Sequence, residues 1–369
     1  MTREYDAVVV GVGTMGSAAL YQLARRGCRV LGLEQFDVAH EHGSMHGETR
    51  IIRLVYHEQH GYVPLIRRAY ELWHELDSTL VHPVGLLDIG VDHGWLIAGG
   101  LRSCLEHGLR HELLDASELR SRFPEHAAPP DHVGLLQPDG GYLDAERAVR
   151  AHAEAAVAAG AELHTRERTI GWSSSSGEIE VHTDAASYRA GRLVLTPGAW
   201  AATLLRLPGG LFVPERQVVA WFETSARSKA PAPVFIAEEE GDAVFYGIAD
   251  ASRLKLGLMH HPGGAADPDT LDRAVHDDEL EALREFAERR LRGVGGLVDA
   301  QVCLFTNTPD KHFVVDLHPE SKGVVVVSAC SGHGFKFAPA LGEIAADLAL
   351  DGATRHPIDF LRLDRFAAV

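Results

Sequence analysis

Three glycines near the N-terminus have the spacing of a dinucleotide-binding turn. Gly11, Gly13 and Gly16 follow an apolar run and open a stretch with helical patterning. Gly11 permits the tight turn, Gly13 lets the backbone approach a pyrophosphate, and Gly16 lets the helix pack closely on the strand. Backbone N–H groups of that helix, starting at Thr14 and Met15, then face the phosphates. The glycines predict a dinucleotide site and leave NAD and FAD both open.

A carboxylate stands where the ribose of a dinucleotide needs an acceptor. The apolar run 30–33 ends in Glu34, which follows Gly16 by 18 residues. This separation is close to the ~20 residues typical of an acid that accepts from a ribose hydroxyl. A glycine-rich turn without a ligand is the competing interpretation, and the strand–turn–helix context makes it the weaker one.

Strand and helix patterns alternate along the elements that must position these residues. Residues 5–10 and 30–33 are expected to form buried strands beside the glycine turn. Near the C-terminus a second apolar strand, 324–328, runs into a glycine loop at 331–336 and a helix at 339–350. One cofactor domain is therefore expected to combine both ends of the chain, with a substrate domain inserted between them.

The middle of the chain contains several further predicted elements. A helix is expected over 113–123, with Ser117 as a plausible cap and Pro124 closing it. Other expected elements are a strand at 85–92, a helix at 144–160, strand-rich stretches at 214–223 and 243–258, and a helix at 277–292.

Composition excludes several classes of protein. A chain of 369 residues, 46% of them hydrophobic, is long enough for two domains with separate cores. A formal net charge of −17 argues against nucleic acid and anionic membranes as partners. The four cysteines form no CxxC pair, and the 22 histidines show no metal-binding spacing, so no metal site is predicted. Without an apolar leader or a spanning run, we expect a cytoplasmic protein.

Three separated segments then indicate a family. Residues 43–53 (GSMHGETRIIR), 302–313 (VCLFTNTPDKHF) and 331–337 (SGHGFKF) resemble the sarcosine oxidase and N-methyltryptophan oxidase family. The strand 216–219 (RQVV) adds to the likeness, which extends over nearly the whole chain.

The resemblance implies a fold of class α/β plus α+β. It consists of a glutathione-reductase-like FAD-binding Rossmann domain and an inserted substrate domain built on a mixed β-sheet. On this basis the FAD-binding domain is expected to be discontinuous and to comprise 1–83, 142–212 and 309–369. The substrate domain is expected to comprise 84–141 and 213–308.

The resemblance also implies an activity. The family contains FAD-dependent oxidases that convert the C–N bond of secondary (N-methyl) amino acids to an imine, which hydrolyses to an aldehyde and an amine, while O₂ becomes H₂O₂. We expect a monomer that binds only small molecules. Three alternatives stay open: a flavin enzyme for a larger or more apolar amine, such as a cyclic imino acid or a secondary-metabolite intermediate; an NAD-linked dehydrogenase; and a non-catalytic flavin-binding scaffold.

The family position for covalent flavin attachment corresponds to Cys303. Attachment through the 8α-methyl group needs a thiolate in a polar or positive neighbourhood. Cys330, just before the C-terminal glycine loop, is the rival within the chain. The other residues that the resemblance places against the cofactor are Ser44, Arg50, Gly332, Gly334, Phe335 and Lys336.

Two cations resemble the family pair that binds the substrate carboxylate. Arg53 offers a bidentate guanidinium fork, and Lys336 adds a point charge. The pocket departs from the family at two other positions. Counted without a gap, the family's histidine falls on Met259, although His260 and His261 follow. An aromatic hydroxyl of the sarcosine oxidases is replaced by Phe305, which makes the expected pocket more apolar.

The remaining candidates are implied to act beside the flavin ring. His46 and Arg50 are expected to stabilise its reduced, anionic form. Lys255 matches the family lysine that promotes oxygen reduction, although a lysine between two leucines on a strand could also face solvent. Tyr246 matches a substrate-side tyrosine of the family. His260 is a further candidate if the alignment with the family is shifted by one residue.

Overall fold

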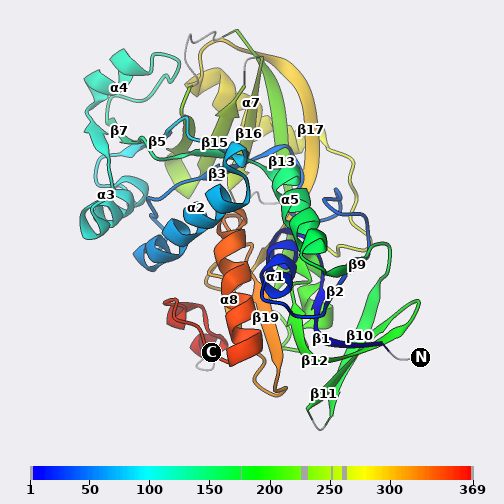
Figure 1. Ribbon diagram of the computed structural model, residues 1–369. Coiled ribbons are helices and arrows are strands. Elements are labelled where there is room, and N and C mark those ends of the chain that lie inside the picture. The colour runs from blue at the N-terminus through cyan, green and yellow to red at the C-terminus, as the bar shows by residue number, and fades with distance from the viewer. Residues whose placement is uncertain (1–2, 176, 226–231, 251, 260–263, 367–369) are drawn as a thin grey trace.

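Two eight-stranded sheets form the two ends of the molecule in the computed structural model (Figure 1). The structure describes residues 3–175, 177–225, 232–250, 252–259 and 264–366. In Figure 1 the first sheet lies at the bottom near both termini, and the second lies at the top. Across the described residues, no helix has both the length and the apolar character that crossing a membrane requires.

The first sheet has the glycine-turn strand at its centre. Strand β1 (Arg3–Val10) pairs in parallel with β2 (Val30–Leu33) on one side and β12 (Ser187–Leu195) on the other. Val8 and Val9 have no exposed surface, as a strand covered on both faces requires. The other strands of this sheet are β9 (Glu162–His164), β10 (Thr169–Ser175), β11 (Glu178–Thr183), β18 (Val314–Leu317) and β19 (Val324–Ser328).

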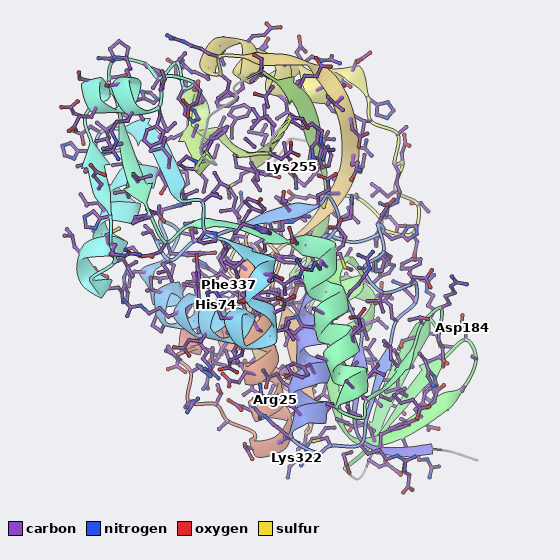
Figure 2. All side chains as sticks on the ribbon, turned by 45° about the horizontal axis from the view of Figure 1, so that its top comes forward. Arg25, His74, Asp184, Lys255, Lys322 and Phe337 are labelled. Carbon is purple, nitrogen blue, oxygen red and sulfur yellow. The ribbon has the colours of Figure 1, made fainter. Side chains whose placement is uncertain are left out.

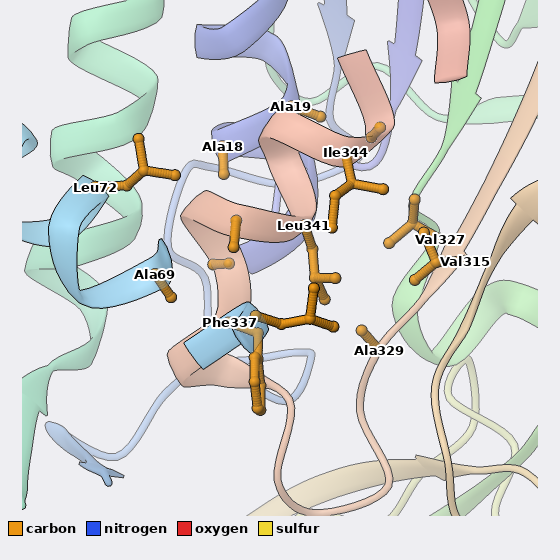
Figure 3. Packing of buried hydrophobic residues seen from close by; sticks show 14 of the residues in the cluster. Ala18, Ala19, Ala69, Leu72, Val315, Val327, Ala329, Phe337, Leu341 and Ile344 are labelled. Atoms are coloured by element: carbon orange, nitrogen blue, oxygen red, sulfur yellow. The ribbon is translucent and has the colours of Figure 1, made fainter. Parts of the chain in front are cut away.

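Helices from distant parts of the chain cover one face of this sheet (Figure 3). Ala18 of the first helix lies against the C-terminal helix so closely that a Cβ at Gly342 would come within 2.6 Å of its backbone. Leu341 and Ile344 fill the space between the helices and the sheet and have no exposed surface. Burial of this apolar surface holds the two ends of the chain together. The helices are α1 (Thr14–Arg25), α2 (Val63–Asp77), α5 (Ala145–Ala158) and α8 (Ala338–Asp351).

The second sheet is mixed, as expected for the substrate domain. Its strand order is β17-β13-β16-β15-β14-β5-β7-β6, in which only β14 and β5 pair in parallel. Helix α7 (Asp277–Arg290) buries Leu283 and Phe286 against one face. The strands are β5 (Leu86–Val91), β6 (Glu112–Leu114), β7 (His132–Gln137), β13 (Val213–Thr224), β14 (Val234–Glu238), β15 (Val244–Ala249), β16 (Arg253–Met259) and β17 (Val294–Asn307).

A small three-stranded sheet lies outside both large sheets. It consists of β3 (Thr49–Ile52), β8 (Gly141–Asp144) and β4 (Val81–His82). This small sheet positions Arg50, and Arg53 follows directly after β3. The two large sheets draw on different stretches of sequence, but the division into domains at the expected boundaries stays a prediction.

The helix expected over 113–123 begins later than the pattern indicated. Residues Glu112–Leu114 form strand β6, and helix α4 covers only Ala116–Arg122. Ser117 is not the cap, because the Asp115 carboxylate accepts from the backbone N–H groups of Ser117 and Glu118. The Glu118 side chain accepts from the Asp115 backbone in return, which completes a capping box and fixes the start of the helix.

Candidate active site

A cavity of about 550 Å³ extends from the glycine turn to the second sheet. The turn after β1 and the loop after β2 line one end, through Gly13, Thr14, Met15 and Glu34. The strands of the second sheet and the loop after β19 line the other end. A cavity of this size suits a cofactor or a ligand of similar volume.

The glycine turn has the geometry that the sequence indicated. Gly11 has a φ of 84°, and a Cβ there would lie 2.5 Å from the carbonyl oxygen of Thr196. A Cβ at Gly16 would lie 1.8 Å from the carbonyl oxygen of Gly11, so only glycine lets α1 approach β1 this closely. Gly13 caps α1 without a side-chain hydrogen bond, which leaves the first N–H groups of the helix directed at the cavity. These residues therefore fit the pyrophosphate of a dinucleotide.

Glu34 lies at the end of the cavity expected to bind the ribose. Its carboxylate accepts from Val12 N at 2.8 Å and from Phe36 N at 3.0 Å, and burial raises its pKa. Two further groups at this end were not expected from the sequence. His40 Nε2 lies 3.5 Å from the Glu34 carboxylate, and the buried hydroxyl of Thr169 has no partner among the described residues. Unpaired buried hydroxyls are costly, so Thr169 fits a site completed by a polar ligand.

Cys303 is buried on β17, among the cations that the sequence predicted beside it. Arg50 Nη2 lies 3.9 Å from the Cys303 sulfur and donates to the backbone carbonyls of Ser44 and His46. His46 Nδ1 lies 3.3 Å from the Gln301 side-chain oxygen, and the interaction of His46 with Cys303 outweighs burial and raises the pKa of the imidazole. The loop before β3 thus directs positive groups at one sulfur atom.

This electrostatic environment distinguishes the two candidate cysteines. Burial raises the pKa of Cys303, but His46, Arg50 and Lys255 outweigh burial and bring it down to about 7. Burial raises the pKa of Cys330, although Thr306 N donates to its sulfur at 3.3 Å. Near neutral pH a substantial fraction of Cys303 is therefore thiolate, whereas Cys330 stays a thiol. The geometry favours Cys303 as the reactive cysteine.

Lys255 does not face solvent. Figure 2 shows it in the upper part of the molecule, within the second sheet, and its exposed fraction is 3%. Its Nζ donates to the carbonyls of Gly47 at 2.6 Å and Thr49 at 2.9 Å and lies 5.5 Å from the ring centre of Trp221. Burial lowers the pKa of Lys255 well below its usual range, with a further lowering by Arg50. Lys255 and His46 stand just behind the wall of the cavity.

The Arg53 side chain is buried and already forms hydrogen bonds within the protein. Its guanidinium donates to the Val55 carbonyl at 2.7 Å and to the Glu58 carboxylate at 2.5 Å, and it lies over the ring of Tyr56. His57 Nδ1 lies 3.1 Å from the same guanidinium. Burial raises the pKa of Glu58, but Arg53 and His57 outweigh it and hold the value well below its usual range. The cavity therefore presents an ion pair whose cation was predicted and whose anion was not.

Lys336 lies beside this ion pair, in the short helix that follows the C-terminal glycine loop. Its Nζ donates to the His333 carbonyl at 2.7 Å and to the Tyr56 hydroxyl at 3.2 Å. The Tyr56 hydroxyl also lies 3.0 Å from His333 Nδ1. Burial lowers the pKa of Lys336 to about 7, and Arg53 contributes in the same direction. The structure thus brings Arg53 and Lys336 to one wall of the cavity, linked through Tyr56.

The loop after β19 is shaped by its two glycines. A Cβ at Gly334 would lie 1.8 Å from the Ala329 carbonyl oxygen, and one at Gly332 would lie 2.8 Å from the Phe305 ring. The tight loop packs against Phe305, and both line the cavity together with Phe335.

Tyr246 and Met259 line the same cavity on the side of the second sheet. Burial raises the pKa of Tyr246 to about 12, so it is an uncharged phenol at neutral pH. Met259 ends β16, whereas the alternative candidates His260 and His261 lie outside the described residues. The second sheet thus contributes largely apolar surface to the cavity.

A second cavity of about 510 Å³ adjoins the first. Glu58, Met259 and His333 line both cavities, whereas Trp95 and Lys311 line the second one alone. Glu58, Tyr56 and His333 received no role from the sequence. The only sequence signal for Glu58 was its position five residues after Arg53. This spacing alone does not show that the chain folds so that the two side chains meet.

A Rossmann-like sheet with a glycine turn, and a cavity that extends from this turn to a group of buried cations, define a dinucleotide-binding enzyme. Among the described residues, no group of three or more His, Cys, Asp or Glu side chains is placed to hold a metal ion.

Comparison with known proteins is consistent with this class. The profile of the family described as FAD dependent oxidoreductase matches residues 6–348. Monomeric sarcosine oxidase of Streptomyces avermitilis is 41% identical and aligns with 100% of this chain and 99% of its own. N-methyl-L-tryptophan oxidase of Salmonella enteritidis is 34% identical over 99% and 100% of the two chains.

A solved structure has the same architecture. NikD, described as an unusual amino acid oxidase essential for nikkomycin biosynthesis, superposes with a TM-score of 0.85 at 29% identity. The match covers 98% of each chain. The chain belongs to the FAD-dependent oxidoreductase family, on the branch that contains the sarcosine and N-methyltryptophan oxidases.

Proposed function

We propose that this enzyme is an FAD-dependent oxidase of N-methyl amino acids that produces an imine and H₂O₂. The observation that carries the proposal is the pair of buried cations, Arg53 and Lys336, at the far end of a cavity that begins at the dinucleotide turn. FAD bound in this cavity supplies the two-electron chemistry that oxidises the amine and reduces O₂. The relatives that support the proposal are named as oxidases of sarcosine and N-methyl-L-tryptophan.

Arg53 and Lys336 bind the substrate carboxylate in this account. Arg53 is paired with Glu58 at 2.5 Å, so an arriving carboxylate competes with Glu58 for the guanidinium. Lys336 Nζ is tied to Tyr56 and His333 at the same wall and adds its charge when protonated. Anchoring the carboxylate fixes the position of the N-methyl group, and the apolar wall at Met259 and Phe305 excludes water from it.

The second cavity favours a substrate with a side chain larger than that of sarcosine. It adjoins the carboxylate-binding wall through Glu58 and His333 and the apolar wall through Met259. A side chain that leaves the α-carbon beside Arg53 can extend into this space and reach Trp95. We therefore expect kcat/KM to be higher for bulky N-methyl amino acids than for sarcosine.

Oxygen consumption tests the function directly. With an N-methyl amino acid in air, the purified enzyme should consume O₂ and produce one aldehyde and one H₂O₂ per turnover. We propose that it works as a monomer, so its activity per chain should not change on dilution. Turnover that requires added NAD, without peroxide, would instead support a nicotinamide-linked dehydrogenase.

We further propose that FAD is attached covalently to Cys303. The support is the lowered pKa of Cys303, at about 7, beside His46 and Arg50. After denaturation the wild-type chain should retain the yellow colour, and Cys303→Ala should release it. Cys330→Ala is the matched control, because Cys330 lies in the same cavity but its pKa is raised. Release from the Cys330→Ala chain together with retention by Cys303→Ala would reverse the assignment.

The pKa of Lys336 predicts how carboxylate binding depends on pH. Its pKa of about 7 means that the cation is present below neutral pH and is lost as pH rises. The Kd of a carboxylate that lacks an amine, such as butyrate, should therefore rise above about pH 7, by up to about tenfold per pH unit. Lys336→Met should bind butyrate more weakly at low pH and with a smaller pH dependence. Parallel curves for the two proteins would show that Lys336 is not the titrating group.

A further inference from the structure

Asp88 is a fully buried acid with no role in the chemistry described above. It lies on β5, an inner strand of the second sheet, and its exposed fraction is 0%. Its register partners on the neighbouring strands are Ile236 and Leu135, which are both apolar. A carboxylate in such surroundings must be paired with a cation or must keep its proton, because an unpaired buried charge is strongly unfavourable.

Gln137 gives Asp88 the surroundings of a neutral acid. Gln137 Nε2 donates to Asp88 Oδ2 at 2.5 Å. The other two oxygens of the pair, Asp88 Oδ1 and Gln137 Oε1, are buried and have no partner among the described residues. Both are acceptors, so a carboxylate leaves both unsatisfied. One proton on Oδ1 can be donated to Gln137 Oε1 and closes a cyclic acid–amide pair with two hydrogen bonds.

The charged groups around Asp88 belong to the proposed substrate site. Burial is the main cause that raises the pKa of Asp88, to about 7; Glu58 acts in the same direction, whereas Arg53 and the hydrogen bond from Gln137 act against it. On the side of helix α3 (Trp95–His107), Cys104 is the titratable neighbour, and its pKa is raised by burial and by Asp88, so it is an uncharged thiol near neutral pH. Arg53 is therefore the cation that Asp88 faces.

We propose that Asp88 is a positioning residue for substrate capture, held as a neutral acid by its burial and by the hydrogen bond that it can donate to Gln137 Oε1, so that no second negative charge opposes Arg53. Loss of the Asp88 proton adds a second buried negative charge that interacts with Arg53 through space. This charge offsets part of the positive charge of Arg53, and carboxylate binding weakens. This inference rests on the proposed function, in which Arg53 binds the substrate.

The test separates Asp88 from Lys336, which titrates in the same range. In a Lys336→Arg background the cation at position 336 persists at all accessible pH values. The Kd of butyrate, followed through the visible spectrum of the holoenzyme, should still rise by about tenfold above pH 7 in this variant. The rise should disappear in Lys336→Arg/Asp88→Asn, because asparagine preserves the paired geometry with Gln137 and cannot ionise. The proposal would be overturned if the Kd of butyrate rose equally with pH in both variants. It would also be overturned if Asp88→Asn raised the Kd by the same factor at every pH.

A second measurement does not depend on substrate. The infrared spectrum of wild type minus Asp88→Asn should contain the carbonyl stretch of a neutral carboxylic acid below pH 7, converting to carboxylate bands at higher pH. Absence of the neutral-acid band would overturn the inference even if the enzyme oxidises N-methyl amino acids. If the band is present but butyrate binds to neither wild type nor Lys336→Arg, the role in capture fails together with the proposed carboxylate site.

Discussion

Replacing Lys255 with methionine is expected to slow the reaction with O₂ by about 10²- to 10³-fold, while amine oxidation in the absence of air changes by only a few-fold. Reduction of oxygen develops negative charge, and a fixed cation in a site without water stabilises that charge strongly. Lys255 is 3% exposed and is held by the Gly47 and Thr49 carbonyls beside Arg50 and Cys303. Methionine keeps the length and volume of the side chain and removes the charge.

Stopped-flow mixing with O₂ measures this effect separately from the amine step. Lys322→Met is the control, because Lys322 lies at the opposite end of the molecule in Figure 2. Because burial lowers the pKa of Lys255, the rate with O₂ in wild type should also fall as pH rises and the cation is lost. A Lys255→Met variant that reacts with O₂ at the wild-type rate would remove Lys255 from the proposed oxygen step.

Replacing Arg53 with methionine should raise the Kd of a substrate carboxylate by about 30- to 1,000-fold, which corresponds to about 2–4 kcal/mol. The variant loses the bidentate donor and leaves Glu58 buried without its cation, so a second anion becomes still less favourable there. Glu58→Gln should act in the opposite direction and tighten butyrate binding several-fold, because it removes the competitor for Arg53.

An ion pair outside the cavity provides a control that distinguishes an effect on ligand binding from an effect on protein stability. Arg216 and Glu279 form a pair whose side chains are each 11% exposed, and neither residue lines the cavity. Arg216→Met should lower the free energy of unfolding, as loss of a buried partner does, but leave the Kd of butyrate unchanged. If Arg53→Met and Arg216→Met both leave the Kd unchanged, Arg53 does not bind the substrate carboxylate.

Local sequence patterns predicted the parts of the fold that depend on neighbouring residues. The glycine turn is an example, because Gly11 and Gly16 are required by contacts within one strand–turn–helix unit. The predicted start of helix α4 was wrong, because β6 at Glu112–Leu114 forms by pairing with residues of β7 that lie 20 to 24 positions later in the chain. Strand pairings over such distances leave no periodic signal in the segment itself.

The same difference between local sequence patterns and long-range contacts applies to the residues of the site. The specific motifs around Arg53, Cys303 and Lys336 placed these residues in one site, and all three line the same cavity, while their roles stay predictions. Asp88 could not be predicted, because a single acid in an apolar strand gives no sign of whether its partner is a cation or an amide. The protonation state of Asp88 depends on its contact with Gln137, and the two side chains meet only because β5 pairs with β7.

The visible spectrum of the purified protein without air tests the central claim most directly. Sarcosine is added first, and bulkier N-methyl amino acids follow. We expect a yellow protein whose colour bleaches with N-methyl amino acids, more completely at low concentrations of the bulky ones. A yellow protein that none of these amines bleaches would leave the fold intact and contradict the assignment as an N-methyl amino acid oxidase.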